Sequence, residues 1–137
     1  FSTVYDCDGY RLPTEAEWMQ AATKGKKQAY PWGDTWDPNR AIAKLGNNGS
    51  PIATKGAAVE GLGGASPFGI LHMAGNVAEW VSDVWEDEEG KDPSLRPVKG
   101  GSYATFQTVQ LQVSEKFKLG VSQSNPTVGF RVVIDPR

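Results

Sequence analysis

The first clear pattern of apolar and polar positions lies near the N-terminal end of the chain. Residues 14–17 read Thr-Glu-Ala-Glu, a capping box in which the Thr14 hydroxyl accepts from the Glu17 backbone N–H and the Glu17 carboxylate accepts from the Thr14 N–H. Trp18 and two alanines follow at helical spacing on one face. The pattern predicts a helix over about residues 15–24 that stops at Gly25.

The C-terminal part of the chain has a strand-like pattern instead. Three segments rich in β-branched and aromatic residues, 98–104, 108–121 and 128–134, are bounded by turn residues. In the second segment Val109, Leu111 and Val113 alternate with polar residues. We therefore predict three β segments at this end of the chain.

The middle of the chain is less regular. Residues 30–36 (YPWGDTW) combine turn-forming residues with two tryptophans. Residues 39–56 contain Asn-Asn-Gly-Ser-Pro and little periodicity, which is typical of a loop. Apolar residues in 77–84 are spaced by three, one and three, which suits a helical turn and a twisted strand equally well. Residues 86–92 (EDEEGKD) are interpreted as a solvated acidic turn.

Composition narrows the class of protein. The 137 residues are predicted to form a single domain, 1–137, and the abrupt start favours the C-terminal portion of a longer protein. Sixteen glycines, nine prolines and five tryptophans indicate loops held by buried rings. A net charge of −2 without a basic cluster argues against nucleic acid as partner, and no apolar run is long enough for membrane insertion. The single cysteine, Cys7, excludes an internal disulfide.

Five motifs in order resemble the formylglycine-generating enzyme, or sulfatase-modifying-factor, family. They are GYRLPTEAEW (9–18), YPWGD (30–34), PFGILHMAGNVAEWVSD (67–83), VKGGSY (98–103) and VGFRVV (128–133). The resemblance implies an α+β domain with a variant of the C-type lectin fold, with few regular elements, small twisted antiparallel sheets and long loops. It covers nearly the whole chain.

Several motif residues have a structural interpretation. Trp18 and Trp80 are expected in the core, and Gly75, Gly100, Gly101 and Gly129 at positions of positive φ or close backbone approach. An arginine inside a strand is tolerated when it is paired, so Arg131 is expected to pair with a carboxylate such as Glu17.

The resemblance also shows which catalytic residues are absent. Enzymes of the family that oxidise a cysteine carry two copper-binding cysteines just after Gly-Gly-Ser, and this pattern falls on Thr105 and Gln110. Neither supplies a thiolate, so no copper is expected. The related sulfoxide synthases use three histidines on a nonheme iron; this chain has only His72, so no iron is expected either. We predict a non-catalytic chain, a pseudoenzyme.

Calcium is the remaining cofactor that the resemblance implies. The family's Gly-Asn-Val-x-Glu segment binds Ca²⁺ through backbone carbonyls and the glutamate, which falls here on Gly75, Val77 and Glu79. Two departures weaken this assignment: His72 stands where an oxygen ligand is usual, and Ile42 where an asparagine would serve a second ion. The alternative for Glu79 is a carboxylate that accepts hydrogen bonds from neighbouring backbone N–H groups.

Residues 104–124 are the predicted binding surface, because small, aromatic, amide and basic side chains suit recognition. By resemblance this stretch corresponds to the hypervariable part of variable proteins from diversity-generating retroelements. Phe106 and Phe117 would be the anchors, with core packing as the alternative for both. The predicted ligand-binding residues are Thr105, Phe106, Thr108, Val109, Gln110, Lys116, Phe117 and Gln123.

Three classes of function stay open at this point. The first choice is a ligand-binding and display module for a protein or other surface ligand. The second is an enzyme domain whose metal ligands lie elsewhere, and the third is a structural lipoprotein component of bacterial gliding or secretion machinery. The resemblance favours an extracytoplasmic or surface-exposed location.

Overall fold

The structure is a computed structural model that describes residues 9–44 and 63–135. Cys7 and residues 45–56 of the loop predicted over 39–56 lie outside the described residues. The elements, in chain order, are α1 (Glu15–Thr23), β1 (Ala78–Trp80), β2 (Trp85–Asp87), β3 (Gly90–Asp92), β4 (Leu95–Lys99), the 3₁₀ helix η2 (Thr108–Leu111), β5 (Lys116–Gly120) and β6 (Val128–Gly129). The predicted α+β class with few regular elements is confirmed.

Helix α1 forms where the capping box predicts it. The Thr14 hydroxyl accepts from the Glu17 N–H, and the Thr14 N–H donates to Glu17 Oε2 at 2.8 Å. The helix ends at Thr23, and the C-cap residue Lys24 has a left-handed φ of 55° and donates its N–H to the carbonyl of Gln20. Helix α1 therefore ends one residue before the predicted end at Lys24, and the chain leaves it through Lys24 and Gly25.

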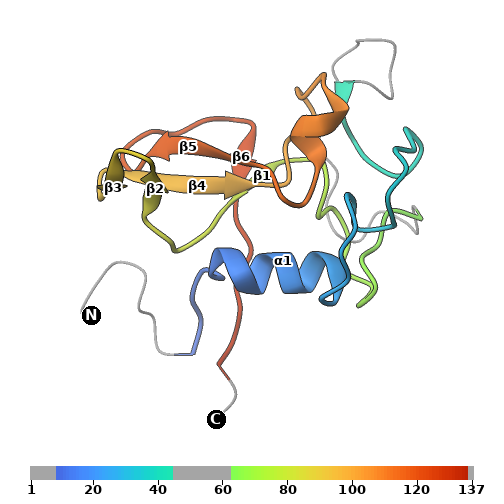
Figure 1. Ribbon diagram of the computed structural model, residues 1–137, viewed down its shortest axis with the longest axis horizontal. Helices are drawn as coiled ribbons and strands as arrows, with labels where there is room; N and C mark the ends of the chain where they lie inside the picture. Colours follow the sequence, from blue (N-terminus) through green and yellow to red (C-terminus); the bar gives the residue numbers. More distant parts are fainter. Residues whose placement is uncertain (1–8, 45–62, 136–137) are drawn as a thin grey trace.

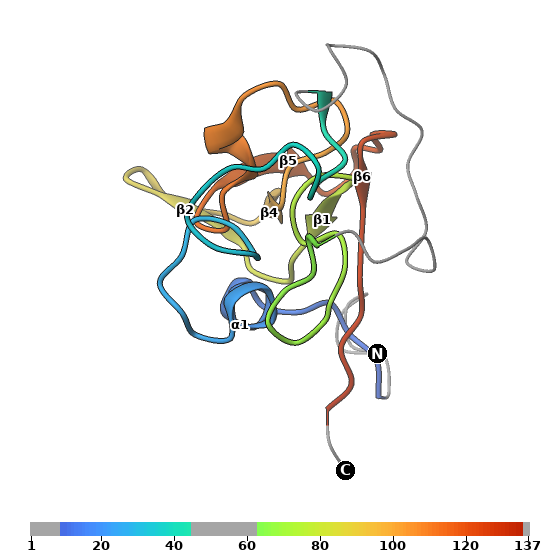
Figure 2. The ribbon, with the colours of Figure 1, turned by 90° about the vertical axis from the view of Figure 1, so that its right-hand side faces the viewer.

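The main sheet has four strands in the order β5-β4-β1-β6, and α1 lies below it in Figure 1. Strand β4 pairs antiparallel with β1 and β5, and its register places Val98 between Trp80 and Phe117. Strand β6 pairs parallel with β1, which the prediction of antiparallel sheets did not foresee. Figure 2 shows β6 leading into the C-terminal segment, which descends past α1.

The strand predictions were wrong in detail, because β4 includes only residues 98–99 of the predicted 98–104 and β6 only 128–129 of the predicted 128–134. The alternation at Val109, Leu111 and Val113 does not mark a strand, because 108–111 form η2; Leu111 and Val113 point into the core, and Val109 is exposed. The strand of this segment is β5, which begins at Lys116. The predicted acidic turn at 86–92 is the β2–β3 hairpin, with most of its residues exposed.

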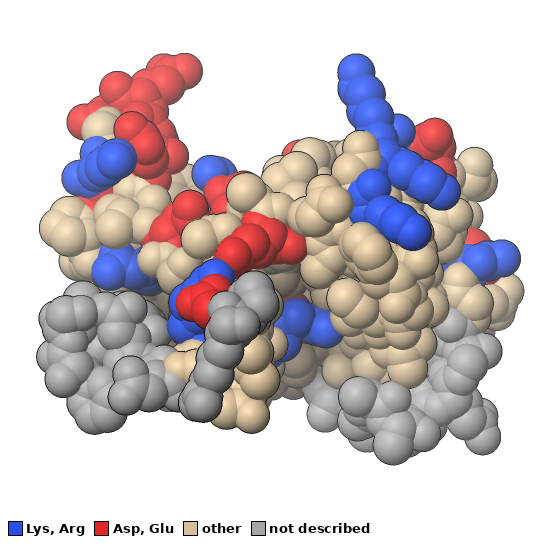
Figure 3. Space-filling model, turned by 90° about the horizontal axis from the view of Figure 1, so that it is seen from below, with Lys and Arg blue, Asp and Glu red and all other residues tan. Residues whose placement is uncertain are grey.

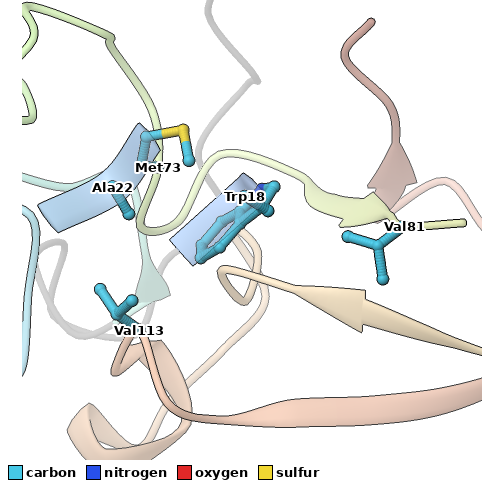
Figure 4. Packing of buried hydrophobic residues seen from close by; sticks show 5 residues of the cluster. All are labelled: Trp18, Ala22, Met73, Val81 and Val113. Atoms are coloured by element: carbon cyan, nitrogen blue, oxygen red, sulfur yellow. The ribbon is translucent and has the colours of Figure 1, made fainter. Parts of the chain in front are cut away.

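Two clusters of buried residues form the core. Figure 4 shows the first, where Trp18 and Ala22 of α1 meet Met73, Val81 and Val113 from the loops around the sheet. The second contains Tyr30, Ala43 and Leu111, and Trp32 and Trp36 of the segment 30–36 pack against it. The prediction of loops held by aromatic rings agrees with this arrangement.

The core prediction was right for Trp18 and wrong for Trp80. Trp18 is buried, whereas Trp80 is half-buried and lines a hollow on the side of the sheet that faces away from α1. The register explains the difference, because Trp80 and its neighbour Glu79 point to opposite faces of β1. Within the described ranges no helix is long and apolar enough to cross a membrane.

Candidate functional site

A buried carboxylate joins the helix, the central strand and the C-terminal segment. Glu79 is 5% exposed, and both of its oxygens accept from Arg131 at 2.6 Å. Its Oε2 also accepts from the Trp18 indole N–H at 2.7 Å. The predicted pairing of Arg131 with a carboxylate is therefore confirmed, but the partner is Glu79 and not Glu17. Arg131 follows β6, the strand next to β1, so Glu79 is the carboxylate within reach.

Glu17 pairs with Arg11 instead. The Arg11 guanidinium donates to both Glu17 oxygens at 2.7 Å and also to Asp135. These bonds, with the Thr14 N–H, lower the pKa of Glu17 to about 2, and Arg11 also lowers the pKa of Asp135. The same two carboxylates raise the pKa of Arg11. This network holds the two ends of the described chain together.

The side of the main sheet that faces α1 also contains a buried lysine. The Lys99 side chain is fully buried, with its ammonium 3.3 Å from Glu15 Oε1 and 5.6 Å from the centre of the Trp18 ring. Desolvation lowers the pKa of Lys99, and the nearby Glu15 opposes that effect. Lys116, which pairs with Lys99 across β4 and β5, binds the other oxygen of Glu15 at 3.1 Å.

The residues predicted for calcium lie together, but their donor set does not fit the ion well. Gly75 has φ 75° and lies against the backbone of Ile42, so only glycine fits there. Glu79 is already neutralised by Arg131 and bonded to Trp18, not to backbone N–H groups as the alternative supposed. Among the described residues no group of three or more His, Cys, Asp or Glu could hold a metal ion. Calcium at this position stays a prediction.

The opposite side of the sheet carries a groove of about 320 Å³. Apolar residues of four strands form its floor: Ala78, Val98, Leu119 and Val128. The rim consists of residues from the segment 101–110, from β5 and from the turn before β6. Among these rim residues are the aromatic rings of Phe106 and Phe117, the hydroxyl and amide groups of Thr105, Gln110, Asn125 and Thr127, and Lys118.

Local hydrogen bonds shape the 101–110 wall of the groove. Gly101 has φ 64° and packs against Leu111, so a side chain at 101 would clash. The Ser102 N–H donates to Thr105 Oγ1 at 2.9 Å, and the Thr105 N–H donates back to the Ser102 carbonyl at 3.0 Å. The Thr105 carbonyl in turn accepts from the Lys44 N–H. The wall is thus a closed turn anchored to the backbone of Lys44.

Four of the eight predicted ligand-binding residues line this groove. They are Thr105, Phe106, Gln110 and Phe117. Phe106 is 61% exposed and Phe117 is 39% exposed, so the core alternative is wrong for both. Gln123 lies in a neighbouring hollow with Trp80.

The other three predicted residues line neither hollow. Thr108 accepts through its carbonyl from the Tyr30 hydroxyl. Val109 is exposed. Lys116 is tied to Glu15 and lies over the Trp85 ring. The sequence pattern grouped these residues with the groove because they are close along the chain, whereas η2 and the pleat of β5 turn them away.

Sequence reasoning missed the floor of the groove and the far part of its rim. Ala78, Val98 and Ser102 were assigned to the framework, and Asn125 and Thr127 to a boundary turn. These residues come from three different parts of the chain, and the pairing of β1 with β4 and β6 brings them together. Family motifs lay at or beside these residues: PFGILHMAGNVAEWVSD contains Ala78, VKGGSY contains Val98 and Ser102, and VGFRVV follows Thr127.

The charges on the face seen in Figure 3 are mixed. Acidic side chains gather at one end and lysine and arginine side chains at the other, with both signs between them. Proteins that bind nucleic acid typically present one continuous basic surface instead. The fold and the groove together describe a loop-rich α+β domain with a polar-rimmed apolar groove and no pair of cysteines at its edge.

Comparison with known families identifies this class. Residues 2–136 match the family described as "Sulfatase-modifying factor enzyme 1-like domain", and the chain belongs to that family. It is 31% identical to a formylglycine-generating enzyme of Thermomonospora curvata over 93% of this chain and 50% of that protein. It is 36% identical to "Inactive C-alpha-formylglycine-generating enzyme 2" of Bos taurus over 69% of this chain and 33% of that protein.

A solved structure is also similar. The chain matches Treponema denticola variable protein 1 with a TM-score of 0.77 and 28% identity, over 96% of this chain and 50% of that one. The chain is therefore similar to a protein named as an enzyme, to a protein named inactive and to a protein named variable. The chain spans a third to a half of the length of these relatives.

Proposed function

We propose that this chain is a non-catalytic ligand-binding domain and that its ligand binds in the groove between residues 101–110 and β5. One observation carries the proposal: Thr105 and Gln110, the positions that correspond by resemblance to the copper-binding cysteines, both line the groove beside two exposed aromatic rings. The positions of the copper-binding cysteines are thus occupied here by residues that suit contact with a ligand.

The side chains of the groove indicate the kind of ligand. A floor of alanine, valine and leucine side chains takes up an apolar group, and Phe106 and Phe117 offer ring surface at the rim. Thr105, Gln110 and Asn125 add hydroxyl and amide groups that both donate and accept hydrogen bonds. A protein surface that presents an apolar side chain flanked by polar backbone would match this combination.

The groove also supports the variable-display form of the proposal. Thr105, Phe106, Gln110 and Phe117 fall within 104–124, between the motifs VKGGSY and VGFRVV, and the likeness to a protein named variable agrees with this. Copies of the gene should differ within 104–124 and stay constant in 98–103 and 128–133. Sequencing several copies tests this, and equal variation in all three segments would contradict it.

A binding experiment tests the groove itself. Peptides selected from a displayed library against the wild-type chain serve as probes, and their affinities are compared among variants. Phe106→Ala and Gln110→Ala should each weaken binding about tenfold. Val109→Ala is the matched control, because Val109 is exposed and lies outside the groove. If selected peptides bind all three variants as well as wild type, the groove is not the binding surface.

The enzymatic alternative has its own readout. Similarity to formylglycine-generating enzymes favours it, and it requires cysteine oxidation in a substrate peptide. We expect a cysteine peptide incubated with this chain and copper(I) to remain unchanged by mass spectrometry, because Thr105 and Gln110 cannot supply thiolates. Conversion of the cysteine to formylglycine would overturn the non-catalytic assignment.

A further inference from the structure

Strand β5 forms one edge of the main sheet and borders the groove. It pairs with β4 on one side, and within the described ranges no strand pairs with its other side. Phe117 and Leu119 line the groove, and Lys118 between them borders it as well. The backbone N–H and C=O groups along the open side of an edge strand can pair with the backbone of another chain.

The register shows which backbone groups of β5 are open. Pro97 stands opposite Lys118, and the Pro97 carbonyl turns towards β1, where it accepts from the Val81 N–H at 3.3 Å. Opposite residues of an antiparallel pair either exchange both backbone hydrogen bonds or make none, so the Lys118 N–H and C=O point away from β4. Gly120, two residues further on, points the same way, and its N–H donates to Gln123 Oε1 at 2.9 Å. The open edge therefore includes Lys118 and ends at Gly120.

Side chains of β5 alternate between the two faces of the sheet. Phe117 and Leu119 point to the groove. Lys116 and Lys118 point to the other face, where their ammonium groups lie 5.5 and 5.8 Å from the centre of the Trp85 ring. A strand added beside β5 would therefore place every second side chain next to Phe117 and Leu119, and the others next to the two lysines. Neighbouring side chains across a strand pair favour apolar with apolar and acidic with basic residues.

The charges at this edge favour an acidic segment. Lys118 is exposed and forms no ion pair within the described part of the chain. A hairpin carboxylate close to it, Asp87, accepts instead from the Trp85 indole N–H at 3.0 Å. Lys116 shares its carboxylate partner, Glu15, with a second lysine. Among the described residues that line the groove there is no carboxylate. An acidic side chain beside Lys118 would therefore add a favourable contact.

We propose that the ligand is an extended segment of a partner protein that pairs with the open edge of β5 and alternates apolar with acidic residues. The proposal rests on the proposed function, in which the groove is the binding surface. The apolar side chains of the segment lie on the groove side beside Phe117 and Leu119, and an acidic side chain lies beside Lys118. The backbone of the segment forms hydrogen bonds with the Lys118 N–H and C=O.

A second copy of this chain suits the edge less well. Two β5 strands paired edge to edge would bring their lysines together on one face, and like charges opposite each other are unfavourable. Lysines on edge strands are a common means of preventing such self-pairing. A partner with acidic residues at alternate positions turns the same lysines into favourable contacts.

Two synthetic peptides with capped ends test the alternation. One is Val-Glu-Phe-Glu-Val and the other is Val-Lys-Phe-Lys-Val, so both offer the same apolar side chains. Calorimetry with the wild-type chain should show about tenfold weaker binding of the lysine peptide. Lys118→Ala should reduce that preference to about threefold or less. The exposed Lys27→Ala, which removes the same charge elsewhere on the surface, is the matched control and should preserve the preference.

Removal of single backbone donors tests strand pairing. N-methylation of the glutamate peptide, one residue at a time, should weaken binding about tenfold at alternate residues and leave it within about twofold at the others, because every second N–H faces β5. Lys118→Pro should bind this peptide about tenfold more weakly than Lys118→Ala, since both lack the charge and only proline lacks the N–H. The methylated peptides leave the protein unchanged, so they decide the question if Lys118→Pro unfolds.

The outcomes separate this proposal from the one on which it rests. If Phe106→Ala weakens the binding of library-selected peptides while N-methylation has equal effects along the glutamate peptide, the groove binds a ligand and strand pairing is wrong. Equal binding of the glutamate and lysine peptides, or no binding of either, also overturns strand pairing. Dimerisation seen by analytical ultracentrifugation and abolished by Lys118→Pro would assign the edge to a second copy instead. If Phe106→Ala has no effect on the selected peptides, the proposed function fails, and this proposal fails with it.

Discussion

The two sides of the main sheet are built from adjacent residues of the same strands but are stabilised differently. Towards α1, Glu79, Lys99 and Lys116 meet Arg131, Glu15 and Trp18 in a network of buried or half-buried charges. Away from α1, Ala78, Val98 and Phe117 form an apolar floor and rim that stay open. One side thus holds the helix in place, and the other leaves apolar surface free for a ligand.

The comparison teaches where substitutions should matter. Removing a partner from the side that faces α1 leaves a charge without its counterpart inside the protein, which is costly. Changing an exposed ring on the groove side removes no native contact of similar value. Stability and binding should therefore depend on different residues, although those residues lie next to one another along the chain.

The largest effect is expected at Glu79. Glu79→Ala leaves Arg131 without its carboxylate and the Trp18 N–H without its acceptor, so the free energy of unfolding should fall by about 3–5 kcal/mol. Urea denaturation measures this change. Glu79→Gln keeps an acceptor for Trp18 and should lose less. A loss below about 1 kcal/mol for Glu79→Ala would show that this network does not hold the fold.

A smaller effect on stability is expected in the 101–111 wall of the groove, where a buried and an exposed side chain can be compared. Leu111, the last residue of η2, is fully buried, so Leu111→Ala should lower the free energy of unfolding by about 2–5 kcal/mol. Phe106, on the same wall, is mostly exposed, and Phe106→Ala should cost within about 0.5 kcal/mol. Thermal melting of both variants provides the comparison. A large drop in melting temperature for Phe106→Ala would make that ring part of the core.

The ion pair at the start of α1 should produce a modest, pH-dependent effect. The pKa of Glu17 is about 2 in the folded chain and near 4.3 when unfolded. Its contribution is therefore complete above about pH 4.5 and is lost as the pH falls towards 2. Glu17→Gln should lower stability by about 1 kcal/mol at pH 7, because the pair is partly exposed.

Urea titrations of wild type and Glu17→Gln at several pH values measure this dependence. The difference between them should shrink as the pH falls from about 4.5 towards 2, because the glutamate is increasingly protonated and then neutral like glutamine. Glu86→Gln on the exposed hairpin serves as control and should show little difference throughout. A constant difference from pH 7 to pH 2 would contradict the assignment.

The smallest effect is expected from metal removal. Arg131 already neutralises Glu79 beside Gly75 and Val77, so EDTA should shift the melting temperature by less than about 1 °C. Metal analysis of protein purified without chelator accompanies this measurement. Stoichiometric calcium together with a clear loss of stability on chelation would instead establish the calcium site that the family resemblance implies.

Local sequence was a good guide wherever neighbours along the chain interact with each other. The capping box predicted the start of α1 because both of its hydrogen bonds join residues three apart. Gly100 and Gly101 were expected at positions of positive φ or close approach, and their φ angles are 88° and 64°, with no room for a side chain at Gly101. The exposure of Phe117 was undecidable, because it depends on the register between β4 and β5.

The partner of Arg131 shows the limit of such reasoning. Its charge inside an apolar strand already required a carboxylate, and Glu17 and Glu79 were equally acceptable by residue type. The parallel pairing of β6 with β1 placed Glu79 next to it, and the antiparallel pairing of Val133 with Arg11 left Glu17 to Arg11. Residues 52 and 6 positions apart along the chain thus formed two separate pairs.

By itself the sequence determined the family, the helix with its cap, the loop-rich character and the absence of a cysteine pair after Gly-Gly-Ser, since these depend on residue types and on neighbours along the chain. Only the tertiary structure decided that Thr105, Gln110 and two phenylalanines border one groove, and that Tyr10, Phe130, Val132 and Ile134 are exposed on one side of the paired segments 10–12 and 130–134. The reason is physical: both surfaces are made by strand pairing between distant segments, and a shift of one residue would turn every side chain to the other face.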